Sequence, residues 1–432
     1  MGFYEERAER TRAFLADRFG MFIHWGLYAI PARGEWVRNT ERISNEDYQK
    51  YFDEFDPVHY DPGRWAALAK KAGMKYAVMT TKHHDGFCLF DSQFTQYKAT
   101  NTPAKRDLIR EYVDAFRAEG IKIGFYYSLI DWRHPDYPKF SDRHHPMREN
   151  EAYKDEQINF ANYVEYLRNQ VRELCTSYGK IDVMWFDFSY DEMKGEKWEA
   201  TKLIEMIREL QPGIIIDNRL SGSGESGAGK MAEPPVYAGD FESPEQIIPT
   251  GGVTDALGRP VPWEACITLN DHWGYHAGNK NYKTAQNVVR MLIECVSKGG
   301  NLLLNVGPNA KGEIPKESIA VLEQVGGWMH DNSASIYHCG PASGQLKPEW
   351  GRYTQRGRSL YAHIFERGVA AVRFNGLEGK IKKARLLMDG SELHLTRPWM
   401  AKDKYQDDAF IELGTANLPD AFSTVVELEL AE

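Results

Sequence analysis

Short apolar runs alternate with amphipathic stretches from residue 19 to about residue 335, and this alternation restricts the fold more than any other feature of the sequence. The apolar runs have the composition of strands buried on both faces, and they cover residues 19–26, 76–82, 121–128, 182–188, 214–219, 265–270 and 301–306. Between them, apolar residues recur at helical spacing over residues 61–72, 107–119, 159–178, 197–210, 284–297 and 316–330. Repeated strand–helix units predict a parallel sheet covered by helices.

The number of strands indicates how this sheet is arranged. An eighth strand, at residues 237–240 or near 247–248, would complete an α/β fold of the (β/α)8-like TIM-barrel type. An open doubly wound sheet is the alternative. After residue 336, apolar and polar residues alternate over 358–373, 380–389 and 422–430, as in antiparallel strands with one solvated face. We therefore predict a (β/α) barrel over residues 1–338 and a small C-terminal antiparallel β-sandwich domain over residues 339–432.

Charge and composition disfavour several kinds of partner. The formal net charge is −9, and no cluster of basic residues stands out, which argues against nucleic acid or an anionic membrane surface. The charged N-terminus lacks the apolar segment of a signal peptide, and no run is long enough to span a bilayer. The five cysteines are scattered. We expect reduced thiols and a cytoplasmic protein, unless a processed leader preceded this sequence.

Polar and aromatic residues gather where the predicted strands end. In a (β/α) barrel the active site lies at this end, because the loops converge there and the barrel interior is packed. The residues concerned are His24, Trp25, His83, His84, Asp85, Tyr126, Tyr127, Trp132, Trp185, Asp187 and Arg219. Aromatic rings cover the C–H surfaces of a sugar, and imidazole, guanidinium and carboxylate groups bond its hydroxyls. The pattern predicts a carbohydrate site.

Asp187 ends an otherwise apolar strand, and a carboxylate in such a place must be desolvated, paired or used in chemistry. Retaining glycosidases use a pair of carboxyl groups about 5–5.5 Å apart, one as nucleophile and one as proton donor. A rigid strand suits the nucleophile. Taken alone, however, an Asp at a strand end fits a metal ligand or a loop-capping residue nearly as well.

Several separate motifs carry a more specific resemblance. They are RFGMFIHWG at 18–26, GEW at 34–36, KHHDGF at 82–87, WFD at 185–187, GDFESPEQ at 239–246 and NLLLNVGP at 301–308. In this order they resemble family 29 of the glycoside hydrolases, the α-L-fucosidases. The motifs span most of residues 18–320, so chance does not explain them.

The resemblance implies a retaining exo-α-L-fucosidase that hydrolyses terminal α-L-fucosides of glycans or glycosides and needs no cofactor or metal. Asp187 would be the nucleophile, since it occupies the family's Trp-x-Asp position. Glu245 would be the acid/base, with Glu242, Glu233 and Glu225 as nearby rivals. The implied substrate-binding residues are His24, Glu35, Trp36, His83, His84, Trp185, Arg219 and one tyrosine of the 126–127 pair, for which we take Tyr127.

Other functions stay open at this point. A fucose-binding protein without turnover would keep the pocket, and a related retaining glycosidase would act on another L-sugar. Residues 224–230 have the spacing of a phosphate-binding loop, but the hydroxyl residue expected after the lysine is replaced by Met231. A zinc site at His83 and His84 is disfavoured, because adjacent residues on a strand point to opposite faces.

Several further segments of the sequence also receive an interpretation. His144 and His145 are interpreted as a solvated surface pair, and Trp263 and residues 270–276 are candidates for the side of the pocket that receives the leaving group. The loop at 133–147 could reach a neighbouring subunit, so a homo-oligomer is an open possibility. The C-terminal domain is expected to act as a structural cap on the barrel.

Overall fold

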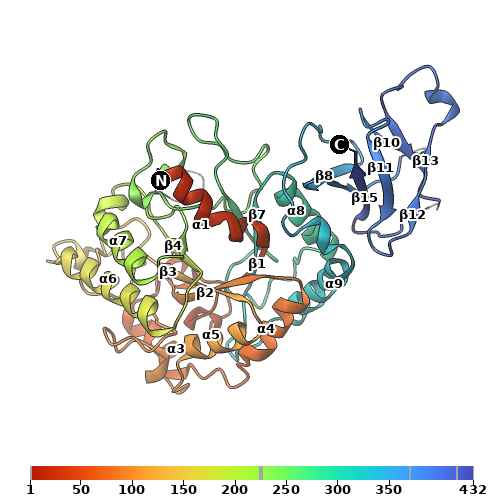
Figure 1. The fold of residues 1–432 in the computed structure, drawn as a ribbon. Coiled ribbons are helices and arrows are strands. Elements are labelled where there is room, and N and C mark those ends of the chain that lie inside the picture. Colours follow the sequence, from red (N-terminus) through yellow and green to blue (C-terminus); the bar gives the residue numbers. More distant parts are fainter. Residues whose placement is uncertain (1, 223–226, 369–370, 415–416, 432) are drawn as a thin grey trace.

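A curled parallel sheet forms the centre of the larger part of the chain in the computed structural model, which describes residues 2–222, 227–368, 371–414 and 417–431 (Figure 1). Its strands are β1 (Phe19–Ile23), β2 (Tyr76–Lys82), β3 (Lys122–Ser128), β4 (Val183–Asp187), β5 (Ile215–Ile216), β6 (Glu264–Thr268) and β7 (Asn301–Val306). They pair in the order β5-β4-β3-β2-β1-β7-β6. The predicted parallel, TIM-like architecture is confirmed, although the fifth strand is only two residues long.

The predicted eighth strand is not formed as expected. Residues Val236–Ala238 make a 3-10 turn instead, and the gap between β5 and β6 is crossed by isolated parallel bridges. These bridges join Asp217 to Phe241, Glu242 to Trp263 and Glu245 to Cys266. Gly239 permits the approach because its φ is +85° and a Cβ there would lie 2.3 Å from the Asp217 carbonyl oxygen. The closed eight-stranded barrel is therefore corrected to seven strands and an irregular bridging segment.

Helices cover the outside of the sheet. Those that the sequence predicts are α4 (Pro62–Lys71), α5 (Leu108–Ala118), α6 (Phe160–Ser177), α7 (Ala200–Leu210), α8 (Ala285–Ser297) and α9 (Lys316–Asn332). Side-chain caps define several starts: Asp61 accepts a hydrogen bond from the Arg64 amide, and Asp107 accepts one from the Arg110 amide. Additional helices, which the sequence pattern did not reveal, are α1 (Phe3–Asp17), α2 (Val37–Thr40) and α3 (Asn45–Glu54).

Helix α1 covers the end of the sheet where the strands begin. The ring of Phe14 packs 5.3 Å from that of Tyr76 and 4.9 Å from that of Phe241, measured between centroids. The backbone carbonyl oxygen of Phe14 accepts a hydrogen bond from the side-chain nitrogen Nδ2 of Asn301, the first residue of β7. Because this end is occupied, the opposite end, where the strands finish, is where a site can open.

The C-terminal part consists of two antiparallel sheets, as predicted. Their strands are β8 (Gly351–Arg356), β9 (Ser359–Ile364), β10 (Val372–Phe374), β11 (Ile381–Leu386), β12 (Glu392–Leu393), β13 (Leu395–Thr396), β14 (Ala409–Ile411) and β15 (Thr424–Leu430). The sheet orders are β12-β11-β15-β9-β8 and β10-β14-β13. The indole of Trp328 in α9 donates to the Ser423 carbonyl, and Arg290 in α8 donates to the Phe422 carbonyl, so this part packs on the last two helices. The domain boundary at 338/339 stays a prediction.

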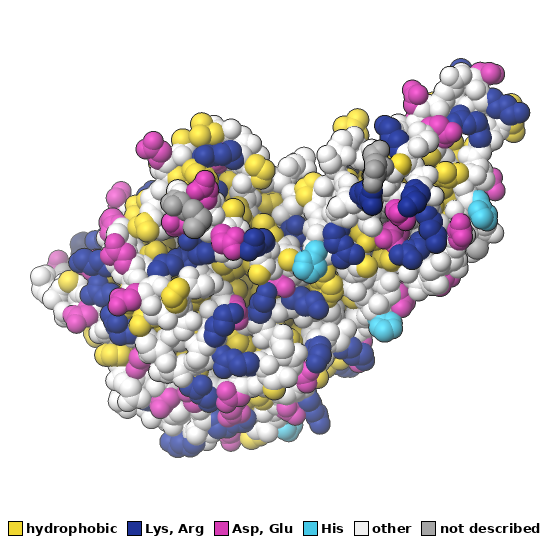
Figure 2. Space-filling model, viewed as in Figure 1, with side chains coloured by type: hydrophobic (Ala, Val, Ile, Leu, Met, Phe, Trp, Pro, Cys, Tyr) yellow, Lys and Arg dark blue, Asp and Glu magenta, His cyan; other side chains and the backbone are white. Residues whose placement is uncertain are grey.

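The surface charges, the lengths of the helices and the cysteines relate to the predicted partners and thiol state of the protein. Basic and acidic side chains are interspersed over the face shown in Figure 2. Within the described ranges, no helix has the length and apolar character needed to cross a membrane. All five cysteines lie in the described part of the chain, where they are buried and unpaired.

Candidate active site

A pocket lies where the parallel strands end, and nearly all of the predicted site residues line it. Its lining consists of Phe22, His24, Glu35, Trp36, His83, His84, Tyr126, Trp185, Asp187, Phe188, Arg219, Glu245, Cys266 and Trp273. These residues are far apart in the sequence and meet because neighbouring parallel strands finish at one edge of the sheet. Among the predicted residues, Tyr127 is missing from the lining.

Asp187, the last residue of β4, lines this pocket and is 8% exposed. Its Oδ1 accepts a hydrogen bond of 2.7 Å from Arg219, and its Oδ2 accepts one of 2.7 Å from the Tyr126 hydroxyl. Burial alone would raise the pKa of Asp187, but the Arg219 charge, with a smaller contribution from the Tyr126 hydrogen bond, holds that pKa below its ordinary value. The carboxylate is thus kept ionised and aimed into the pocket.

Arg219 connects two acids. One terminal nitrogen donates to Asp187, and the other lies 2.9 Å from Oε2 of Glu245. Its Nε donates to the Ser243 hydroxyl at 3.0 Å, and the guanidinium lies 4.4 Å from the centre of the Trp185 ring. A planar cation held at this many points cannot rotate freely, so it fixes the relative position of the two carboxylates.

Glu245 is the more accessible of these two acids, with 39% of its side chain exposed. Its described rivals lie elsewhere: Glu242 is fully buried and accepts a hydrogen bond from Asn218, and Glu233 is exposed outside the pocket lining. The remaining rival, Glu225, lies outside the described residues. Of the three candidate proton donors that lie within the described residues, Glu245, Glu242 and Glu233, Glu245 alone lines the pocket with Asp187.

Glu35 is a third carboxyl in the pocket. It is 6% exposed, and its Oε2 accepts a hydrogen bond of 2.8 Å from the Gly274 amide. Burial is the main reason why its pKa is raised, and the nearby charge of Glu245 adds to this. A buried carboxyl anchored to the backbone suits a residue that binds substrate hydroxyls.

The adjacent residues His83 and His84 both line the pocket, with ring centroids 4.0 Å apart. The expectation that they point to opposite faces was wrong, because β2 ends at Lys82 and its pairing with β3 is irregular between Thr80 and Lys82. Burial lowers the pKa of His24 to about 4 and that of His84 to about 3, and it also lowers the pKa of His83. These imidazoles are therefore neutral near pH 7.

Tyr126, and not Tyr127, is the tyrosine of the pocket. The Tyr126 ring packs inside the barrel 5.9 Å from Trp185, whereas the Tyr127 hydroxyl donates to Gln170 of α6 at 2.8 Å. Successive side chains of a strand face opposite sides of the sheet, so only one of the pair can reach the pocket. The choice of Tyr127 was wrong by one position.

Several pocket residues were not predicted to have a role. Phe22, Phe188 and Cys266 belong to apolar runs, which give no signal of function. Trp273 lies in the 270–276 segment considered for the leaving-group side, whereas Trp263 is buried outside the pocket. Phe188 also has a φ of +82°, a rare conformation for a bulky residue, directly after Asp187.

Two other predicted assignments change in the structure. His145 is buried and its Nε2 lies 3.1 Å from the Trp132 carbonyl oxygen, while the half-buried His144 ring packs 5.0 Å from Phe188, so this pair is not solvated. In the loop at 224–230, the first three residues lie outside the described residues, and Ala228–Lys230 form one 3-10 turn. Within the part of the chain that is described, no three His, Cys, Asp or Glu residues are grouped as metal ligands.

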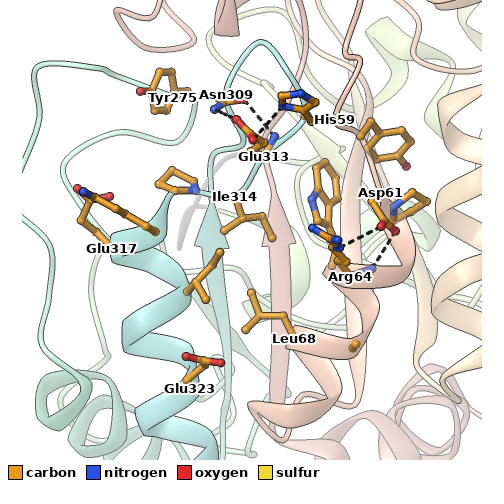
Figure 3. A pocket seen from close by; sticks show the side chains of 18 of the residues that line it. His59, Asp61, Arg64, Leu68, Tyr275, Asn309, Glu313, Ile314, Glu317 and Glu323 are labelled. Carbon is orange, nitrogen blue, oxygen red and sulfur yellow. Dashed lines mark hydrogen bonds and ion pairs between the residues drawn. The ribbon is translucent and has the colours of Figure 1, made fainter.

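A larger groove, of about 1330 Å³, lies outside the barrel between α4 and α9 (Figure 3). Its charged side chains are mostly paired: His59 bonds Glu313 at 2.9 Å, and Arg64 lies 3.3 Å from Asp61. Neither Asp187 nor Glu245 lines it. Despite its smaller size, the pocket at the strand ends is the one that Asp187 and Glu245 line.

Comparisons with known proteins agree with this geometry. The sequence model of one family, described as Alpha-L-fucosidase, matches residues 5–334. The structure of alpha-L-fucosidase isoenzyme 1 from Paenibacillus thiaminolyticus is 63% identical, has a TM-score of 0.96, and the match covers 99% of this chain and 100% of that chain. Human plasma alpha-L-fucosidase is 29% identical over 345 residues, which cover 74% of this chain and 68% of the relative.

A further solved structure concerns mechanism. It is a GH29 alpha-L-fucosidase from Bacteroides thetaiotaomicron, described as a trapped covalent intermediate in complex with 2-fluoro-fucosyl fluoride. It is 29% identical, with a TM-score of 0.82, and the match covers 98% of this chain and 96% of that chain. The match of the family over most of the barrel, together with the 63% identical structure, leads to one conclusion. This chain belongs to the α-L-fucosidase family, family 29 of the glycoside hydrolases.

Proposed function

We propose that this chain is a retaining exo-α-L-fucosidase that hydrolyses terminal α-L-fucosides, with Asp187 as nucleophile and Glu245 as acid/base. The observation that carries this proposal is the guanidinium of Arg219, which contacts both carboxyl groups, at 2.7 and 2.9 Å. In retaining glycosidases the two carboxyl groups lie about 5–5.5 Å apart, so that one can attack the sugar directly. Two acids on the two terminal nitrogens of one guanidinium are held close, as this mechanism requires.

The first chemical step forms a covalent intermediate. An oxygen of Asp187 attacks the anomeric carbon while the bond from that carbon to the leaving oxygen breaks, and Glu245 donates a proton to the leaving oxygen. The product of this step is a β-linked fucosyl ester. The depressed pKa of Asp187 supports its part, because a nucleophile must be ionised when the substrate arrives.

The second step releases fucose. Glu245, now a carboxylate, takes a proton from water, and the oxygen of that water attacks the anomeric carbon and displaces Asp187. Two inversions give net retention of configuration. The partial exposure of Glu245 supports this part, because the group must exchange protons and meet water while Asp187 stays enclosed.

The remaining pocket residues suit a 6-deoxy sugar. His24, His83, His84 and Glu35 provide buried polar atoms for hydroxyl groups, and Trp36 lies at the pocket wall. The rings of Phe22 and Trp185, 5.0 Å apart, add an apolar surface. Such a surface favours a methyl group over a hydroxymethyl group by about 1–3 kcal/mol.

Removing the nucleophile tests the proposal. Asp187→Ala should lower kcat for 4-nitrophenyl α-L-fucoside by roughly 10⁴-fold, because no residual group can form the ester. The measurement is nitrophenol release, with circular dichroism and thermal unfolding as folding controls. High activity in the folded variant would reject Asp187. An inactive wild type that still binds fucose would reject the fucosidase proposal in favour of a binding protein.

The acid/base assignment has a matched pair of variants, because Glu245 and Glu35 are both pocket carboxyls. Glu245→Ala should still form the intermediate from substrates with good leaving groups, and azide should restore turnover with retained configuration. Glu35→Ala should mainly weaken binding and show no azide rescue. If only Glu35→Ala were rescued, the proton donor would be Glu35.

A further inference from the structure

Two imidazoles of the pocket are bonded on their inner nitrogens to groups that the mechanism has not used. The Nδ1 atom of His24 lies 2.7 Å from Oδ1 of Asn305, and the Nδ1 atom of His84 lies 2.7 Å from the hydroxyl oxygen of Ser128. Asn305 is 1% exposed and Ser128 is fully buried. The direction of each hydrogen bond is fixed, because Asn305 and Ser128 each make a second hydrogen bond to a backbone carbonyl oxygen.

Asn305 is constrained by a backbone carbonyl. Its amide nitrogen Nδ2 donates to the carbonyl oxygen of Trp273 at 2.7 Å. A carbonyl oxygen can only accept, so the NH2 group must face Trp273 and the amide oxygen must face His24. That oxygen also can only accept, and therefore the proton between Asn305 and His24 belongs to Nδ1 of the histidine.

Ser128 is constrained in the same way. Its hydroxyl donates its single proton to the Ile130 carbonyl oxygen at 2.8 Å. Toward His84 the hydroxyl oxygen can then act only as an acceptor, so Nδ1 of His84 carries the proton. In a neutral imidazole one nitrogen is protonated and the other has a lone pair. Burial keeps both rings neutral near pH 7, since it lowers the pKa of His24 and of His84.

The remaining ring nitrogens therefore lack protons. Nε2 of His84 lies 4.0 Å from Oδ2 of Asp187, which is beyond hydrogen-bond distance. Two atoms that can only accept do not bond each other, so a proton donor must come from a ligand. A hydroxyl group of a sugar bound in the pocket has this character.

We propose that Asn305 and Ser128 are positioning residues that fix His24 and His84 in the Nδ1–H tautomer, so that the pocket offers two Nε2 acceptors to hydroxyl protons of the substrate. The identity of that substrate as a fucoside rests on the proposed function. A site built to accept a hydroxyl proton discriminates strongly against an analogue without it. Fluorine replaces a hydroxyl in size but donates no proton, so it is the analogue that the pocket should reject.

The C-terminal sheets contain an internal reference. There, the Thr354 hydroxyl donates to the Ser335 carbonyl at 2.7 Å and lies 2.9 Å from Nε2 of the buried His363. The same reasoning gives His363 the opposite tautomer, with the proton on Nε2. One spectrum of one protein can therefore contain both forms.

The direct test is nitrogen NMR of the full chain labelled with ¹⁵N-histidine near pH 7, with no substrate present. We expect Nδ1–H signals for His24 and His84 and an Nε2–H signal for His363, assigned by single His→Gln variants. An Nε2–H tautomer at either pocket histidine would overturn the inference. Because this measurement does not depend on turnover, its failure can be told apart from failure of the proposed function, which is tested by the activity of the wild type.

Variants test the role of the two supporting side chains. Asn305→Ala should remove the preference of His24 for the Nδ1–H tautomer, and Ser128→Ala should do the same for His84. In each variant the preference for a hydroxyl over fluorine at one sugar position should fall by about 10-fold. The substrates are 4-nitrophenyl α-L-fucosides with fluorine at C3 or C4. Ser128→Ala removes only one oxygen and serves if Asn305→Ala does not fold. Unchanged tautomers and an unchanged hydroxyl-to-fluorine ratio in the folded variants would refute the positioning role.

Thr354→Val is the matched control. It removes a buried hydroxyl with the same bonding pattern, and it should change the His363 signal while leaving the hydroxyl-to-fluorine ratio unchanged. A change of that ratio in Thr354→Val would show that general destabilisation produces the effect, and it would contradict the inference.

Discussion

The parallel barrel and the C-terminal antiparallel sheets differ in how completely their strands are buried. Every residue of β2 and β7 is buried, because helices cover one face of the sheet and side chains fill the other. In β11, by contrast, Lys382, Lys383 and Arg385 face solvent, and two of them pair with acids on β15: Lys382 with Glu429 and Arg385 with Glu427. A strand of the barrel can therefore present polar groups to a ligand only at its end.

This difference in burial separates the barrel mouth, where the candidate site lies, from the C-terminal sheets, where charged side chains face water. Asp187 ends β4, whereas the charged residues of β11 lie on an open face where water already solvates them. A carboxylate enclosed at a strand end depends on its neighbours for its pKa, and exposed ion pairs contribute only about 0–1 kcal/mol. Substitutions in the barrel mouth should thus change kinetics, and those in the C-terminal sheets should change stability.

The largest effect after loss of the nucleophile is expected for Arg219→Met. Without the cation, kcat/KM should fall by about 10²- to 10³-fold. Arg219 lowers the pKa of Asp187, so its loss should raise that pKa and move the acidic limb of the kcat/KM profile to higher pH. In the wild type, the stabilisation from ionised Asp187 is present above the ordinary carboxyl pKa and is lost as pH falls through the lowered value.

Arg290→Met is the control from the other region. Arg290 donates to the Phe422 and Phe365 carbonyls at the contact between α8 and the C-terminal sheets. Its loss should lower the unfolding temperature and leave the pH profile in place. If the acidic limb of the kcat/KM profile shifted equally in Arg219→Met and Arg290→Met, the contrast between the barrel mouth and the C-terminal sheets would be wrong.

The tyrosine pair gives a smaller effect. Tyr126→Phe removes a hydrogen bond to the nucleophile and should lower kcat/KM by about 10-fold. Tyr127→Phe removes a bond to Gln170 behind the sheet and should cost about 1 kcal/mol of stability with kcat/KM almost unchanged. Steady-state kinetics measure the change in kcat/KM, and urea unfolding measures the change in stability. A larger kinetic loss in Tyr127→Phe would restore the original choice.

The smallest kinetic effect is expected in the C-terminal core. Leu360 is fully buried there, and Leu360→Ala should cost about 2–5 kcal/mol of stability while the kcat of the folded protein stays within about 2-fold. Leu395→Ala, at a site that is 47% exposed, should change neither quantity appreciably. A kcat that fell with Leu360→Ala at full folding would show that these sheets shape the pocket.

The regular elements of the barrel were predictable because their signals are strong. Strands buried on both faces read as apolar runs, and helices such as α5 carry a clear apolar stripe. Helix α1 gave no such signal, since its buried residues are Arg7, Thr11 and Phe14. The bridging segment beside β5 was missed as well, because a proline at 244 and a glycine at 239 disguise its extended course.

Most residues of the site could be predicted from the sequence, but the choice between two neighbouring residues of one strand could not. Strand ends located Asp187 and Arg219, and the family resemblance added Glu35 and Glu245. A shift of one residue reverses the face of a side chain, so the sequence could not decide between Tyr126 and Tyr127. Asn305 received no role because it lies inside an apolar strand, and its hydrogen bonds to His24 and to the Trp273 carbonyl are visible in the structure and not in the sequence.

The most direct measurement of the central claim is covalent labelling of the nucleophile. The wild type and Glu245→Gln would be incubated with 2-fluoro-fucosyl fluoride, digested at low pH and analysed by tandem mass spectrometry. We predict that fluoride leaves the anomeric carbon and that one 2-fluoro-fucosyl group is bound per chain, as an ester of Asp187, with a longer life in Glu245→Gln. A label on Glu245 or Glu35, or no adduct while the substrate is hydrolysed, would contradict the assignment of Asp187 as nucleophile.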